Sequence, residues 1–201
     1  MTRTGPDWGR LYRDHVSAIA ALAGGLSDEQ LATSVPGTPA WTVHDVLAHL
    51  AGGPADAVAE RMDGAPSPAW TARHVGERAG LPVDLLMAEL AANTDHVAES
   101  VVDSPRPAVV WDIAVHHADL HEALGLGRLP ERYWLPVAEA LGPMMAPELM
   151  AVAPPYEVFR AVFSRRSRAQ MASWGADVDV ARLEAMCVFG PRDDDQPVPA
   201  V

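Results

Sequence analysis

Three residues of this chain have the types and spacing of metal ligands: His49, Asp112 and His116. Asp112 and His116 stand at positions i and i+4, so their side chains project from one face if the segment is helical. Imidazole nitrogens and a carboxylate oxygen are common ligands of divalent transition metals, and three protein ligands leave coordination positions for water or a substrate. The pattern therefore predicts an open metal site between two helices.

Spacing alone leaves a second interpretation open, because a helical histidine beside an acid is often only a hydrogen-bonded pair. Asp119 lies on the same helical face as Asp112 and His116, and Ile113 and Leu120 flank that face. Burying a carboxylate without a partner is costly. This polar stripe therefore requires a cation, a proton or several hydrogen bonds.

The helix that carries His49 has a clear start signal. The Thr42 hydroxyl can accept a hydrogen bond from a free backbone N–H, and Asp45, three residues later, can reach back to Thr42. We expect the triplet Gly52-Gly53-Pro54 to end or kink this helix. His49 is expected at the border of the core.

The helix that carries Asp112 and His116 is predicted over residues 111–125, ending on a glycine cap. His117 and His121 point away from the polar stripe, and we expect both to be exposed. His44 points away from His49 around the earlier helix, so it is predicted on the surface as well.

Helical spacing predicts further helices over residues 8–22, 82–102, 131–141 and 156–173. The first two complete a four-helix bundle with the ligand-bearing helices, and one connection of about twenty residues is long enough for a lid or pocket wall. His15 is predicted to be a hydrogen-bonded core histidine. We expect one helical domain over residues 1–190 and a disordered tail over residues 191–201.

Composition excludes several function classes. The net charge of −12 argues against binding to nucleic acid or to an anionic membrane. All fifteen basic residues are arginine, which excludes Schiff-base chemistry and a phosphate-binding P-loop lysine. No secretory or membrane-spanning pattern is present, so we expect a cytoplasmic protein, either a monomer or a homodimer.

The sole cysteine, Cys187, lies in the apolar stretch Leu183–Phe189. A free cysteine in such a stretch is usually a small buried hydrophobe. No disulfide can form within the chain, and any thiol chemistry requires a thiol from a cofactor.

At these residues the chain resembles the mycothiol-dependent maleylpyruvate isomerase family, part of the broader group of DinB-like metal-binding helical bundles. Three blocks carry the resemblance, in the family's order: Trp41-Thr42-Val43-x-Asp45-Val46-x-x-His49-Leu50, the acid-x-x-x-His-x-x-Asp-Leu run from Asp112 to Leu120, and Phe159 to Gln170 followed by Phe189-Gly190-Pro191. The resemblance implies an all-α fold, with a DinB-like four-helix bundle and additional C-terminal helices.

The resemblance also implies that His49, Asp112 and His116 bind a divalent metal, usually zinc in this family. The family acid is typically glutamate, one methylene longer than Asp112. Facing helices lie about 8–10 Å apart, which leaves a short aspartate less reach. Three explanations are open: the helices lie closer, a water intervenes, or the site has lost its metal.

Mycothiol as thiol cosubstrate and a small electrophilic metabolite as substrate follow from the same resemblance. The implied reaction is thiol transfer or cis–trans isomerisation. Asp119 would orient His116 or a coordinated water. Arg165, Arg166 and Arg168 resemble the family's arginine-bearing helix, which implies that they bind the cofactor, with Arg165 and Arg166 also acting on an acidic substrate. A solvated helix end is the alternative interpretation of this cluster.

Two other functions are compatible with the sequence. A metal-dependent hydrolase or lyase would activate water directly, without a thiol. A non-catalytic bundle that binds a small ligand is the third hypothesis. It is suggested by Asp112, which stands where the family typically has glutamate.

Overall fold

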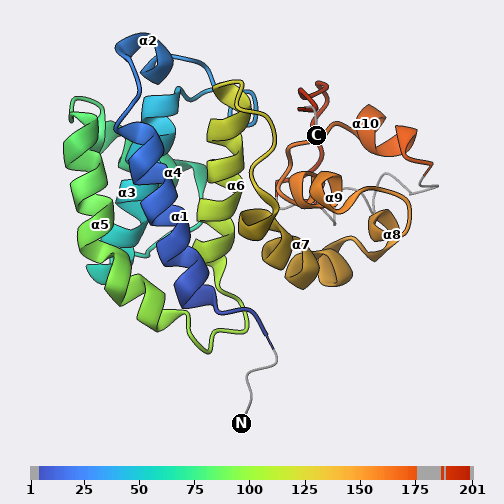
Figure 1. The fold of residues 1–201 in the computed structure, drawn as a ribbon, viewed down its shortest axis with the longest axis horizontal. Helices are drawn as coiled ribbons and strands as arrows, with labels where there is room; N and C mark the ends of the chain where they lie inside the picture. Colours follow the sequence, from blue (N-terminus) through green and yellow to red (C-terminus); the bar gives the residue numbers. More distant parts are fainter. Residues whose placement is uncertain (1–4, 176–186, 188, 200–201) are drawn as a thin grey trace. The chain divides into compact units, whose positions relative to one another are not determined.

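The computed structural model describes residues 5–175, 187 and 189–199 (Figure 1). Over these residues the chain forms ten helices and no β-strand, which confirms the all-α fold. The chain divides into two compact units, Met1–Leu124 and Gly125–Val201. The sequence predicted one domain over residues 1–190, whereas these residues belong to two compact units.

The first unit holds α1 (Trp8–Ala23), α2 (Asp28–Leu31), α3 (Val43–Val58), α4 (Pro68–Arg78), α5 (Val83–Ser100) and α6 (Ala108–Ala123). Four of them form the predicted bundle: α1 packs on α5 and α6, and α3 packs on the same two helices (Figure 1). Tyr12, Ile19, Leu47, Leu90 and Ile113 are among its buried side chains. The aliphatic side chains among them each contribute about 1.5–3 kcal/mol relative to full exposure.

The start of α3 is the predicted capping box, in which the Thr42 hydroxyl accepts from the Asp45 N–H and the Asp45 carboxylate accepts from the Thr42 N–H. Of the end or kink expected at Gly52-Gly53-Pro54, the end does not occur, because α3 continues through Pro54 to Val58. Proline removes one backbone hydrogen bond from the helix. Packing of α3 against α4 and α5 compensates for that loss.

The connection between α3 and α5 contains α4, a helix that the sequence did not predict. The Ser67 side chain accepts from the Trp70 N–H at 3.2 Å, and Pro68 occupies the first turn. Both are ordinary helix-start signals. The helix α4 packs against α3 and buries His74 and Arg78. The connection in which we expected a lid or pocket wall thus contains a helix with a polar buried face.

Three histidines lie deeper than the sequence predicted, and a fourth is where it was expected. His15 is buried, as predicted, and its Nδ1 lies 3.0 Å from Nδ1 of His117. His117 is therefore buried and not exposed, because α1 packs on that face of α6. His121 is half-buried, and His44 is half-buried with its Nε2 2.9 Å from the Leu81 carbonyl oxygen.

The second unit holds α7 (Glu131–Met145), α8 (Pro147–Met150), α9 (Pro155–Val162) and α10 (Arg168–Ser173). Its aromatic core includes Trp134, whose ring centroid lies 5.0 Å from that of Tyr156. The single helix predicted over 156–173 is wrong, because Ser164 adopts a positive φ of 63° between α9 and α10. The start signal that was missed is a capping box from Ser167 to Gln170.

Residues 192–196 pack against the start of α10, in contrast to the disorder expected for the tail. Backbone bonds join Arg168 to Arg192, at 3.0 Å, and Gln196 N–H donates to the Gln170 side chain at 3.1 Å. Residues 200–201 and most of the apolar stretch before Cys187 lie outside the described residues. No helix in the described part of the chain is long and apolar enough to cross a membrane.

Candidate metal centre

The first unit brings the three predicted ligands together at the contact between α3 and α6. His49 lies on α3, and Asp112 and His116 lie on α6. Their ligand atoms all lie within 4.8 Å of one another. His49 Nε2 is 3.3 Å from one carboxylate oxygen of Asp112, and His116 Nε2 is 3.6 Å from the other. The two helices thus converge on one carboxylate.

The two separations that involve Asp112 are close to those expected around a divalent metal. Zinc bonds of about 2.1 Å in a tetrahedral arrangement place neighbouring ligand atoms about 3.4 Å apart. Although aspartate is one methylene shorter than glutamate, the Asp112 side chain therefore comes close to both histidines. Of the explanations left open by the sequence, a close approach of α3 and α6 is the one that this geometry favours.

The exposed side of the cluster is its carboxylate. The Asp112 side chain is 46 % exposed, whereas those of His49 and His116 are 3 % and 7 % exposed. The half-buried Trp41 covers the rings, with centroid distances of 5.1 Å to His49 and 5.8 Å to His116. A small ligand can therefore approach from the Asp112 side, beside an aromatic wall.

His116 is held from behind by Asp119 of the same helix. The buried Asp119 places a carboxylate oxygen 3.0 Å from His116 Nδ1. Burial lowers the pKa of His116, and the neighbouring charges of Asp112 and Asp119 only partly oppose this. His116 is therefore neutral at neutral pH, as a metal ligand must be.

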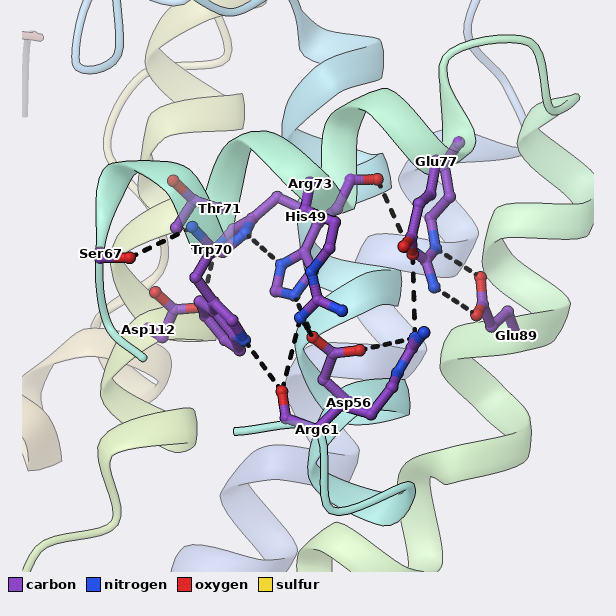
Figure 2. A network of polar contacts seen from close by, with 12 residues as sticks. His49, Asp56, Arg61, Ser67, Trp70, Thr71, Arg73, Glu77, Glu89 and Asp112 are labelled. Carbon is purple, nitrogen blue, oxygen red and sulfur yellow. Dashed lines mark hydrogen bonds and ion pairs between the residues drawn. The ribbon is translucent and has the colours of Figure 1, made fainter. Parts of the chain in front are cut away.

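His49 is held from behind by a longer chain of groups, which the sequence did not reveal. Its Nδ1 lies 3.1 Å from Nδ1 of His74 on α4, and His74 Nε2 lies 2.9 Å from a carboxylate oxygen of Asp56 on α3. Both His74 and Asp56 are fully buried. Figure 2 shows this network beside Asp112.

Two arginines also pair with Asp56, and one of them, Arg73, shares with His74 the same carboxylate oxygen. Arg61 lies 2.6 Å from one oxygen of the carboxylate, and Arg73 donates to the other (Figure 2). Burial by itself would raise the pKa of Asp56, but the hydrogen bond with His74 and the charges around it keep that pKa below its ordinary value. Asp56 is therefore ionised. The available sequence signal was its i+7 position from His49, which places both on one face of α3.

The structure places the predicted arginine cluster in the second unit. Arg165 and Arg166 lie in the connection between α9 and α10, not on a helix. Both are buried. The Arg166 guanidinium donates to Glu157 at 2.6 Å, and that of Arg165 donates to the Phe163 carbonyl at 2.6 Å. The Arg168 side chain is 35 % exposed and lies 3.4 Å from Asp193.

The fold and the site define a helical bundle with a candidate metal centre of two histidines and one aspartate. The family of the mycothiol maleylpyruvate isomerase N-terminal domain matches residues 12–131, more than half of the chain. The chain belongs to this family, which confirms the resemblance. The matched region contains the candidate metal centre and ends before the arginine cluster. No curated protein and no solved structure matches the chain.

Proposed function

We propose that this protein is a metal-dependent enzyme that uses mycothiol on a small electrophilic metabolite, either transferring the thiol or adding it transiently to permit cis–trans isomerisation. The observation that carries the proposal is the convergence of His49, Asp112 and His116 in a chain of this family. The donor set fits zinc, since two imidazoles and one carboxylate are typical of zinc sites with an open position.

The protein's own contribution is to hold the two histidines with their Nε2 atoms facing Asp112. Asp119 places a carboxylate oxygen 3.0 Å from Nδ1 of His116, whose Nε2 faces Asp112. Trp41 excludes water from one side of the rings, and the exposed Asp112 side admits the thiol and the electrophile. A divalent metal held there would supply the charge that favours the thiolate of mycothiol over its thiol.

The lack of strong nucleophiles in the chain itself also favours an external thiol. Burial raises the pKa of Cys187 to about 11, so this thiol is protonated at neutral pH. The chain has no lysine. A nucleophile strong enough to attack an electrophilic double bond therefore comes from the cosubstrate.

The predicted binding role of Arg165, Arg166 and Arg168 stays a prediction. We propose Arg168 as the member that binds an acidic group, because its side chain is partly exposed. Arg165 and Arg166 are buried in contacts within their own unit.

Two measurements on protein purified without an affinity tag test the proposal. Elemental analysis after incubation with zinc and gel filtration should give about one equivalent of zinc per chain. Calorimetry should then detect mycothiol binding to the zinc-loaded protein, and Cys187→Ser should leave that binding unchanged.

The outcomes separate the three functions compatible with the sequence. Retained zinc without mycothiol binding at millimolar concentration would contradict the proposal and favour a thiol-independent hydrolase or lyase. Failure to retain zinc would also contradict it and favour a non-catalytic bundle.

A further inference from the structure

We propose that His74 and Asp56 are positioning residues that set the tautomer of His49, keeping its hydrogen on Nδ1 and its Nε2 bare toward Asp112. The inference rests on the proposed function only where it assigns that bare nitrogen to a metal. The tautomer itself is a property of the metal-free chain, so it can be tested separately.

The first step is the direction of the hydrogen bond between His74 and Asp56. The Asp56 carboxylate is paired with Arg61 and Arg73, and an ionised carboxylate can only accept. The ring atom that faces it is Nε2 of His74, at 2.9 Å. This nitrogen therefore carries the hydrogen and donates it. A neutral imidazole has one N–H, so Nδ1 of His74 is a bare acceptor.

The second step derives the position of the hydrogen on His49 from that on His74. His74 Nδ1 and His49 Nδ1 lie 3.1 Å apart, a hydrogen-bond distance that needs one donor and one acceptor. Because the His74 atom accepts, the His49 atom donates. A neutral His49 then has its lone pair on Nε2, which is the atom 3.3 Å from Asp112. The ionised Asp56 thereby keeps the hydrogen off the nitrogen of His49 that faces the candidate metal centre.

The third step is that His74 has no room to turn away. Its ring centroid lies 4.1 Å from that of Trp70, on the same helix. It also packs on Gly52 of α3, where an added Cβ would lie only 2.6 Å from His74 Cγ. Closely packed rings keep one rotamer. The network is therefore preorganised when α4 is docked on α3.

Nitrogen-15 NMR of the histidine side chains tests the tautomer in metal-free protein above neutral pH. In wild type we expect His49 with its hydrogen on Nδ1 and His74 with its hydrogen on Nε2. His74→Leu removes the acceptor, and His49 should then move its hydrogen to Nε2 and donate to Asp112. A wild-type His49 that carries its hydrogen on Nε2 would overturn the inference.

Zinc affinity, measured by competition with a chelator, gives a second readout. His74→Leu should weaken zinc binding by about 10–100-fold. His74→Asn has nearly the same shape as leucine but offers an amide oxygen in the place of Nδ1, so it should restore most of the affinity. His121→Leu, which removes a half-buried histidine outside the network, is the control and should match wild type.

These variants distinguish positioning from simple packing. Equal affinities for His74→Leu and His74→Asn, with both variants folded, would overturn the inference, since the acceptor would then have no role. A wild-type protein that shows the expected tautomer but binds no zinc would instead refute the proposed function and leave the tautomer assignment intact.

Discussion

His116 and His49 face the same carboxylate but rest on different kinds of support. His116 is held by Asp119, three residues later on the same helix. His49 is held by His74, which reaches it from α4 and is 25 residues away in the chain. The first support lies within α6, whereas the second requires α4 to dock on α3. One half of the site thus depends on local structure and the other half on tertiary packing.

The largest expected effect follows from removing either ligand. His49→Ala and His116→Ala should each lower zinc affinity by more than the roughly 10–100-fold typical of a supporting residue. His44→Ala and His121→Ala should change it little, because neither histidine belongs to the cluster. Chelator competition measures all four. Comparable losses in the controls would mean that the cluster is not where zinc binds.

The two supporting carboxylates should differ in what their loss affects. Asp119→Asn should lower zinc affinity by about 10–100-fold while the unfolding midpoint changes little. Asp56→Asn should also reduce the free energy of unfolding by about 1–3 kcal/mol, because it leaves Arg61 and Arg73 without their carboxylate. Urea unfolding of the metal-free proteins measures the difference, and equal midpoints for the two variants would contradict it.

Adjacent glycines in α3 test the docking of α4. Gly53→Ala should stabilise the protein by about 0.5–1 kcal/mol, since alanine favours a helix and its Cβ would meet other atoms only at 3.8 Å or more. Gly52→Ala should lose that gain and weaken zinc binding, because its Cβ displaces His74. If Gly52→Ala proves as stable and as tight a zinc binder as Gly53→Ala, the close packing of α4 on α3 is wrong.

The smallest effect concerns stability against pH. Burial holds the pKa of His74 and of His116 below the ordinary value of 6.5. Below that pH these histidines bind more protons in the unfolded chain than in the folded protein. The free energy of unfolding should therefore fall as the pH drops. The lowered pKa of Asp56 adds loss of the same sign at still lower pH. Thermal melts of metal-free protein across this range should show the decline, and a constant or rising midpoint would contradict it.

What could be predicted from the sequence was mostly local. The i, i+4 spacing of Asp112 and His116, the i+3 position of Asp119 and the capping box at Thr42 depend on a few neighbouring residues, and the structure has the predicted geometry at each. The contact of His49 with the α6 ligands is not local, and the family resemblance, more than spacing, indicated it.

The features that were missed depend on which faces of helices meet. His117 lies on the side of α6 that α1 covers, and no pattern near it in the sequence indicates that neighbour. The supports His74 and Asp56 lie 18 residues apart, on helices that pack closely at Gly52. The uninterrupted course of α3 through Pro54 also depends on packing, since contacts with α4 and α5 outweigh the lost backbone bond.

X-ray absorption spectroscopy of the zinc-loaded, tag-free protein tests the metal centre most directly. We predict nitrogen and oxygen ligands with the outer-shell scattering of two imidazoles and no sulfur. Addition of mycothiol should then introduce one sulfur ligand at about 2.3 Å. Absence of imidazole scattering would contradict the assignment of His49 and His116, and a zinc environment unchanged by millimolar mycothiol would contradict the thiol chemistry.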